Sequence, residues 1–451
     1  MMNAPKKIAA YAVAVCVTGI FVQAPAWATI PVQHWTQPSG AQVYLIESPA
    51  IAMLDVQLDF DAGSRRDPPE QAGLASLSAS LLEKGVRARD GAPALDENAL
   101  GEAWADLGAQ FSANASSDRM SFSLRSLADP ALLDKAVALA ARQIAEPAYP
   151  DAVWQRERQR LQAALKESYT RPASVVGRAY SAAVYGGHPY GYEMTEATLG
   201  RISVDDFKAA HAAGVVGCRA RISMVGAVSR AQADAIAERL LSRLPQVVCA
   251  SLPALPALPD VEALPQAQEK LIPFDSAQAH VLMGQPGFKR ADPDYFALTV
   301  GNYILGGGGF VSRLTNEVRE KRGLTYGVSS SFSPGMHAGS FTVGLQTRPD
   351  QTAQAVQIVR QVVSNFVSKG PTDAELKAAK DNLVGGFALR IDSNRKLLGN
   401  LSGMAWNNLA LDYLDTWTQQ VEKITVGDIK AAFARKLQPD KMVTVILGAA
   451  K

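Results

Sequence analysis

The chain repeats itself on either side of a proline-rich stretch. SFSLRSLADPALLDKAV (residues 121–137) aligns without a gap with SFTVGLQTRPDQTAQAV (residues 340–356), and YPDAVWQRERQRL aligns with GPTDAELKAAKDNL after a shift of three residues. Each copy carries the pattern of an alternating strand, a turn at proline and an amphipathic helix. Two helix-bearing stretches can resemble each other by chance, but the shared register of strand and turn favours a duplication. The chain is therefore expected to fold as two similar halves.

The proline-rich stretch sets the expected domain boundaries. Prolines recur through residues 244–268 and exclude a helix there, which favours an extended spacer. We expect an N-terminal domain over residues 29–243 and a C-terminal domain over residues 269–451. In each half, strand patterns follow one another like hairpins and are mixed with helical patterns, at residues 73–86, 131–146, 229–243 and 351–368. This predicts an α+β fold in which helices pack on one face of a mostly antiparallel sheet.

One strand pattern carries several carboxylates. IAMLDVQLDFDAGS (residues 51–64) alternates as expected for a strand with a single buried face. Asp55, Asp59 and Asp61 share the opposite side, which we expect to be solvated.

The first 28 residues have the three parts of a secretory signal. Lys6 and Lys7 precede an apolar stretch that is short for a membrane span, and Ala26-Trp27-Ala28 offers small residues for cleavage near Ala28. Cys16 lies within the apolar stretch without the small preceding residues of a lipoprotein signal. No later run approaches the ~18 apolar residues of a membrane helix. We expect an exported periplasmic protein with no membrane contact after signal cleavage.

Charge and cysteine usage agree with that expectation. Two of the 45 basic residues lie in the leader, and the rest balance the 43 acidic residues, so a nucleic-acid partner is disfavoured. Cys218 opens a strand pattern, and Cys249 follows a helix that would run back toward the start of that strand. In an oxidising compartment this arrangement suggests a disulfide between them.

Several catalytic motifs are missing. No two of the five histidines have the i, i+4 spacing of a paired-imidazole metal helix, and no P-loop, dinucleotide fingerprint or G-x-S-x-G elbow occurs. His188, in GGHPYG, is expected to cap or pack a turn.

The most informative stretch is LGGGGFVSRLTNEVREKRGLTYGVSSSF (residues 305–332). Its glycines precede an expected helix over residues 311–321 that stops at Gly323, and a serine-rich strand carrying Tyr326 follows. Arg319 in the last turn and Tyr326 early on the strand can therefore converge, and together they could hydrogen-bond a carbonyl oxygen or an oxyanion. The chemistry alone equally allows Arg319 to pair with Glu317 or Glu320 on the surface.

Here the sequence resembles the insulinase/pitrilysin-type metallopeptidases, a family that includes the mitochondrial processing peptidase subunits. SRLTNEVREKRGLTY is similar to the signature of that family's C-terminal half, and DAGSRRDPPEQAGLAS and GGHPYGYEMTEATLGRISVDDF resemble stretches of its first half. The resemblance covers essentially the whole chain after the leader. It implies two homologous domains that form half of a clam-like chamber. It also implies that Arg319 and Tyr326, seven residues apart, bind substrate near the scissile bond.

The chain lacks the metal-ligating residues that active members of this family carry. Active members carry H-x-x-E-H after GLA and a further glutamate later in the chain. Here the corresponding positions are Ser76, Ala79, Ser80 and Ala164. Glu157 and Glu167 lie near Ala164 and are the alternative placements of the later glutamate. Zinc requires three protein ligands, so we expect no metal and no other cofactor in this chain. A nucleophilic role for Ser76 or Ser80 would need an adjacent base, and no histidine is predictably near.

We therefore expect the zinc-free subunit of a heterodimeric peptidase, inactive alone. A homologous partner chain would hold zinc, and Arg319 and Tyr326 would reach the peptide substrate from this chain. The alternative is a non-enzymatic peptide-binding or scaffold protein of the same fold. A third possibility, an independent peptidase with unrecognised ligands, has the least support.

Overall fold

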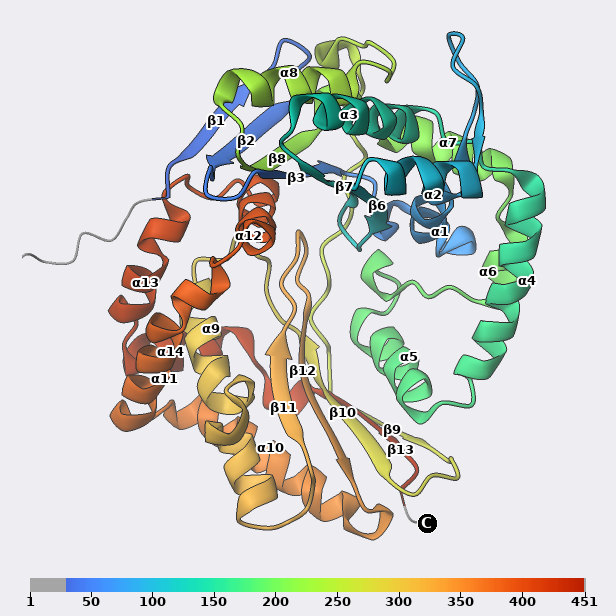
Figure 1. Cartoon of the computed structure of the whole chain (residues 1–451). Coiled ribbons are helices and arrows are strands. Elements are labelled where there is room, and N and C mark those ends of the chain that lie inside the picture. The colour runs from blue at the N-terminus through green and yellow to red at the C-terminus, as the bar shows by residue number, and fades with distance from the viewer. Residues whose placement is uncertain (1–29, 450–451) are drawn as a thin grey trace, which may run out of the picture.

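Two β-sheets, one from each half of the chain, organise residues 30–449, which are the residues that this computed structural model describes. The signal sequence expected over residues 1–28 lies outside them. The first sheet has the order β1-β2-β8-β3-β7-β6 and the second has the order β11-β12-β10-β13-β9 (Figure 1). The strands of the first sheet are β1 (Val32–Thr36), β2 (Gln42–Glu47), β3 (Met53–Phe60), β6 (Gln110–Ala115), β7 (Met120–Leu127) and β8 (Arg221–Gly226). Those of the second are β9 (Gln268–Ile272), β10 (Ala279–Pro286), β11 (Val328–Phe332), β12 (Ser340–Thr347) and β13 (Val443–Leu447).

The two sheets share one topology, apart from the extra edge strand β1. In each sheet a single parallel pair, β2 with β8 or β9 with β13, is followed by three antiparallel strands. The strands that the sequence alignment paired, β7 and β12, occupy equivalent places and lead into equivalent helices, α3 (Pro130–Ala145) and α10 (Thr352–Lys369). The mixed, mostly antiparallel α+β fold and the duplication are confirmed.

The helices of the first half are α1 (Leu74–Leu81), α2 (Glu97–Asp106), α3, α4 (Asp151–Ser168), α5 (Pro172–Tyr185), α6 (Glu196–Arg201), α7 (Val204–Gly214) and α8 (Arg230–Leu241). Those of the second half are α9 (Tyr295–Asn302), α10, α11 (Asp373–Gly385), α12 (Asn394–Trp406), α13 (Tyr413–Lys423) and α14 (Val426–Lys436). A short hairpin of β4 (Gly85–Val86) and β5 (Leu95–Asp96) projects from the first half. No helix of residues 30–449 combines the length and the apolar character needed to cross a membrane.

Each sheet is covered on its second face by a helix from the opposite half. Helix α12 packs on β3 and β8 of the first sheet, and α5 packs on β10 and β13 of the second (Figure 1). Tyr180 of α5 donates a hydrogen bond from its hydroxyl to the carbonyl oxygen of Phe341, at 2.9 Å. Gly284 on β10 is required there, because a Cβ would lie only 2.2 Å from that hydroxyl. This exchange of helices joins the halves through buried surface rather than through the linker alone.

The exchange overturns the expected solvated face of β3. Asp55 and Asp59 are both buried, and the Asp59 carboxylate is fully inaccessible. It accepts hydrogen bonds from Arg119 at 2.9 Å, from Ser121 at 2.5 Å and from Ser402 of α12 at 3.0 Å. The alternating pattern identified the strand correctly, but the polar face is covered by a helix that lies more than 330 residues further along the chain.

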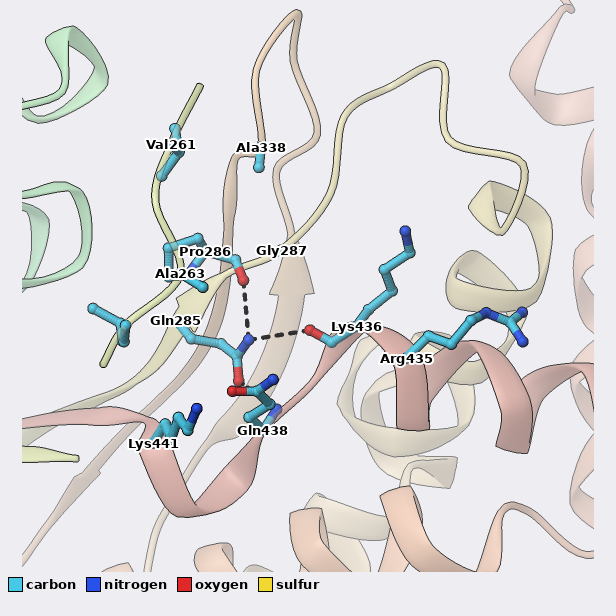
Figure 2. A pocket seen from close by; sticks show the side chains of 11 residues that line it. Val261, Ala263, Gln285, Pro286, Gly287, Ala338, Arg435, Lys436, Gln438 and Lys441 are labelled. Atoms are coloured by element: carbon cyan, nitrogen blue, oxygen red, sulfur yellow. Dashed lines mark hydrogen bonds between the residues drawn. The ribbon is translucent and has the colours of Figure 1, made fainter. Parts of the chain in front are cut away.

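The proline-rich segment lies against both halves. Residues 252–264 form no helix or strand, and Figure 2 shows Val261 and Ala263 beside Gln285 and Pro286 at a pocket of about 200 Å³. His188 contacts the carbonyl oxygen of Pro259 through Nε2, at 3.1 Å, and Nδ1 accepts from the Tyr190 backbone N–H. The expected role of His188 in a turn is confirmed.

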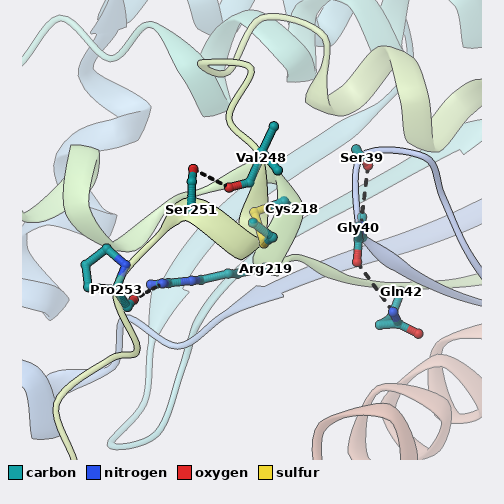
Figure 3. Close-up of a disulfide and its surroundings, with 10 residues drawn as sticks. Ser39, Gly40, Gln42, Cys218, Arg219, Val248, Ser251 and Pro253 are labelled. Carbon is teal, nitrogen blue, oxygen red and sulfur yellow. Dashed lines mark hydrogen bonds between the residues drawn. A yellow bond between two sulfur atoms is a disulfide. The ribbon is translucent and has the colours of Figure 1, made fainter.

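The disulfide between Cys218 and Cys249 is formed (Figure 3). It ties the 3₁₀ turn Gly217–Arg219, which precedes β8, to the 3₁₀ turn Cys249–Ser251 near the start of the proline-rich segment. Arg219 donates a hydrogen bond to the carbonyl oxygen of Pro253 at 2.5 Å, so the segment leaves the first half in a fixed direction.

Candidate functional site

The glycine-rich stretch forms two π-helical turns with a glycine loop between them. Helix α9 continues into a π-helical turn over Tyr303–Gly307, and a second π-helical turn spans Thr315–Glu320. The helix expected over about residues 311–321 is present, but it begins at residue 313 and ends at residue 320, because residues 309–311 form a separate 3₁₀ turn. π-helical turns are rare and are frequent at functional sites, since they displace side chains from the positions of an ordinary helix.

The glycines serve two different purposes. Gly306 is buried against β11, where a Cβ would lie 2.4 Å from Ser330 Oγ, so only glycine allows the close approach. Gly309 has φ +63°, a left-handed conformation that favours glycine, and the chain turns outward there. Phe310 and Val311 follow directly and are 71% and 73% exposed.

Arg319 and Tyr326 lie side by side. The Arg319 guanidinium carbon is 5.0 Å from the centre of the Tyr326 ring, and Tyr326 is 85% exposed. Tyr326 precedes β11 rather than lying on it. Its position is fixed by buried Thr325, whose hydroxyl donates to the carbonyl oxygen of Gln346 at 2.6 Å. The two side chains are thus held together on the surface with their polar groups close to solvent.

Phe310 is a third side chain at this site, in contact with Arg319. Its ring centre is 4.7 Å from the guanidinium carbon, so the cation contacts two exposed aromatic rings. Phe310 was not among the residues predicted from the sequence. An apolar residue directly after four glycines was the available signal, because a large side chain in a flexible loop has no local reason to be there.

The sequence left two partners open for Arg319, namely Tyr326 and an acidic neighbour, and Arg319 contacts both kinds. Arg319 Nε lies 3.4 Å from Glu320, whereas Glu317 pairs with Lys321 at 2.6 Å and with Arg322 at 2.7 Å. Hydrogen bonds from Lys321 and Arg322 hold the pKa of the Glu317 carboxyl below its usual value. An exposed pair such as Arg319 with Glu320 contributes little free energy. The Arg319 guanidinium therefore remains available to an incoming acceptor.

The positions that the resemblance assigns to zinc ligands hold no ligating group. Ser76 and Ser80 are exposed on α1, and the Ser80 hydroxyl donates to the carbonyl oxygen of Leu77 at 2.9 Å. Ala79 is buried, and Ala164 is exposed on α4. Among residues 30–449, no group of three His, Cys, Asp or Glu side chains could hold a metal ion. Methyl groups and neutral hydroxyls do not fit zinc, so no reaction step in this chain is assigned to a metal.

The remaining side chains near these positions have structural partners. Glu157 pairs with Arg160 at 2.8 Å, and Glu167 pairs with Arg171 at 3.1 Å. The one fully buried serine of α1 is Ser78, whose Oγ lies 2.8 Å from the hydroxyl of Tyr149. Within the described chain, no histidine hydrogen-bonds to Ser76 or Ser80, so neither serine has a base to activate it.

Comparisons with known proteins agree on one family. Residues 42–198 match the family model described as insulinase (peptidase family M16), and residues 201–383 match the one described as peptidase M16 inactive domain. A crystal structure from Pseudomonas fluorescens, titled as a peptidase M16 inactive domain, is 34% identical, with a TM-score of 0.85 over 93% of this chain and 98% of that one. The periplasmic protease PqqL from Escherichia coli, 18% identical, shares the fold with a TM-score of 0.77, over 99% of this chain and 49% of PqqL.

Two sequence relatives carry contrasting descriptions. An uncharacterized zinc protease of Mycobacterium leprae is 26% identical over 430 residues, which is 92% of this chain and 91% of the relative. A Helicobacter pylori protein described as a non-peptidase homolog is 33% identical over 175 residues, which is 38% of this chain and 40% of the relative.

Proposed function

The chain belongs to the M16 (insulinase) peptidase family, and from that premise we propose that it is the zinc-free subunit of a two-chain peptidase. In this proposal a homologous partner chain binds the zinc, and the two chains close around a peptide substrate. The observation that carries the proposal is that this chain has the substrate-binding pair of the family but not its zinc ligands. Arg319 and Tyr326 lie together, with Tyr326 exposed and Arg319 half-buried, whereas Ser76, Ala79, Ser80 and Ala164 stand at the positions that the resemblance assigns to zinc ligands.

The proposed role of the pair is to bind the carbonyl oxygen of the scissile peptide bond. The Arg319 guanidinium and the Tyr326 hydroxyl both donate hydrogen bonds, and both can point at one acceptor from adjacent positions. As a tetrahedral intermediate forms, negative charge develops on that oxygen. Donors held in place beforehand stabilise this charge more than they stabilise the neutral carbonyl, which lowers the barrier.

The proposed location is the periplasm. The expected signal sequence supports export, and the disulfide between Cys218 and Cys249 is typical of an oxidising compartment. Peptides small or unfolded enough to enter a closed chamber are the proposed substrates.

A second candidate, a non-enzymatic peptide-binding or scaffold protein, is favoured by one group of findings. The match over residues 201–383 is to a domain described as inactive, and the Helicobacter pylori relative is described as a non-peptidase homolog. A scaffold has no need of the Arg319–Tyr326 pair, so we place this candidate second.

The deciding experiment combines native mass spectrometry with zinc analysis on the tagged chain purified from its own host. A complex with a second chain of similar mass and one zinc ion supports the two-chain peptidase. The complex should then cleave a quenched-fluorescent peptide library that neither chain cleaves alone. A zinc-free monomer or homodimer without peptidase activity supports the second candidate and contradicts the first.

A further inference from the structure

A second polar pocket lies in the C-terminal half, apart from Arg319 and Tyr326. It has a volume of about 220 Å³ and lies between the loop before α9, the 3₁₀ turn Phe387–Arg390, α12 and α13. Its lining includes two arginines, Arg290 and Arg390, and no acidic residue. Among residues 30–449, no carboxylate lies within 4.0 Å of either guanidinium. Two like charges at one pocket without a counter-charge create a positive potential that favours an anion.

Both arginines are held by aromatic rings. The Arg290 guanidinium carbon lies 3.6 Å from the centre of the Tyr295 ring, and Arg290 Nη2 donates to the Tyr413 hydroxyl at 2.7 Å. The Arg390 guanidinium carbon lies 5.2 Å from the centre of the Trp417 ring, whose face is stacked on Phe387. Contact with a ring occupies the flat face of a guanidinium and leaves its N–H edge free. That edge is the part that binds a carboxylate through two parallel hydrogen bonds.

One turn of α13 places the two arginines at the same pocket. Tyr413 and Trp417 are four residues apart and therefore lie on one face of that helix. Burial and the neighbouring Tyr295 raise the pKa of Tyr413 to about 12, so its hydroxyl stays protonated at neutral pH. Tyr413 accepts from Arg290 and so fixes the position of that guanidinium at the pocket.

The opposite side of the pocket is open and partly apolar. Gly399 and Gly403 lie one helical turn apart on α12, and a Cβ on either would meet no atom within 4 Å. Met404 and Leu409 also line the pocket. An aliphatic or aromatic group can therefore lie over the bare helix backbone while its charged end reaches the arginines.

We infer that this pocket binds an organic carboxylate whose neighbouring group is apolar or aromatic, with Arg290 and Arg390 holding the carboxylate. The volume suits a single residue rather than a folded surface. Two sources share this chemistry, a free small acid and the C-terminal residue of a peptide. The inference goes beyond the proposed function and does not depend on it, because it concerns binding to the isolated chain.

Isothermal titration calorimetry on the purified full-length chain tests the inference, with N-acetylphenylalanine and its amide as matched probes. We expect saturable binding of the acid, and at least about tenfold weaker binding of the amide, because the amide loses the charge-assisted hydrogen bonds. Arg390→Gln should weaken binding of the acid by a similar factor. Arg230→Gln is the matched control, because Arg230 also contacts an indole ring, that of Trp35, in the other half, and it should leave binding unchanged.

Two further variants keep the test independent of folding. Arg290→Gln also removes a packing contact, so its effect is interpreted together with Gly403→Leu, which fills the pocket and keeps both arginines. Both should abolish binding while retaining the circular dichroism of the parent chain.

A tetrapeptide ending in a free phenylalanine carboxylate that binds as tightly as the single residue identifies a peptide end as the source, and failure of that peptide identifies a free acid. Equal binding of acid and amide, binding unchanged in Arg390→Gln and Gly403→Leu, or no binding of any probe would overturn the inference.

Discussion

The carboxylate of Asp59 accepts a hydrogen bond from Ser402 Oγ at 3.0 Å, across the boundary between the two halves of the chain. Arg119 donates to both residues, at 2.9 Å in each case, and its guanidinium lies 5.5 Å from the centre of the Trp406 ring. A charged group from β3 is thus neutralised and covered where α12 docks.

Asp59→Ala should therefore destabilise the protein strongly. Removing the fully buried carboxylate leaves the half-buried Arg119 guanidinium without its counter-charge and Ser121 without its acceptor, at a cost of about 3 kcal/mol in the free energy of unfolding. Asp350→Ala is the control, because Asp350 pairs with Arg348 where both side chains are exposed, and it should cost no more than about 1 kcal/mol. Urea denaturation of both variants gives the comparison, and equal midpoints would show that the contact carries no stability.

The disulfide should stabilise the chain mainly by restricting the unfolded state. It closes a loop with a sequence separation of 31 residues, for which the chain-entropy estimate is about 3–4 kcal/mol. The double variant Cys218→Ser/Cys249→Ser should show that loss in urea denaturation. Peptide mapping of the unreduced, denatured protein should find neither cysteine as a free thiol, and alkylation of both would contradict the pairing.

Arg319→Ala and Tyr326→Phe should each lower turnover of the proposed two-chain peptidase by about 10²-fold, which is typical of losing one oxyanion donor. The loss should fall mainly on kcat, because the donor acts on charge that develops in the transition state. Arg322→Ala is the matched control, since Arg322 pairs with Glu317 on the same turn and points to no proposed substrate atom. Unchanged kinetics in both site variants would remove the pair from the mechanism.

Phe310→Ala should lower turnover of that complex more mildly, by roughly two- to fivefold, which corresponds to an exposed cation–π contact of about 0.5–1 kcal/mol. Its ring contacts the same Arg319 guanidinium that Tyr326 contacts, and so restricts the positions open to Arg319. Phe310→Tyr keeps a ring at this position and should restore activity. Val311→Ala, next to it in the same exposed loop, should have no effect, and equal losses from both alanine variants would instead indicate a general requirement for the loop.

Stability should fall as the pH drops from neutral toward 4, in part because of His211. Burial lowers the pKa of His211 to about 4, although its contact with the Ile144 carbonyl oxygen opposes the shift. The unfolded chain binds this proton near pH 6.5 and the folded chain does not, so the contribution is complete above pH 6.5 and is lost as the pH falls toward 4. Urea midpoints of His211→Gln should depend less on pH across this range than those of the parent chain. His34→Gln, which changes an exposed histidine, should retain the full dependence.

Local pattern predicted much of the candidate site. Helical periodicity placed Arg319 in the last turn of a helix, and glycine's conformational freedom placed the end of that helix near Gly323. The structure brings Arg319 and Tyr326 together as expected. The π-helical winding of Thr315–Glu320 was not predicted, because it depends on how the helix packs against its neighbours rather than on its own composition. Phe310 was missed for a related reason, since its contact with Arg319 crosses a loop whose path only the folded chain fixes.

The sequence by itself determined the duplicated halves, the α+β pattern within each half and the extended proline-rich segment. It suggested the pairing of Cys218 with Cys249, which the structure then formed, and the family resemblance placed Ser76, Ala79, Ser80 and Ala164 where zinc ligands are expected. These features depend on residue chemistry and on short-range periodicity, which are visible along the chain. The tertiary structure alone decided that α5 and α12 exchange sheets, that Asp59 is buried, and that Arg290 and Arg390 share a pocket. Each of these depends on contacts between segments about a hundred or more residues apart, and no local pattern specifies which face of a sheet a distant helix will cover.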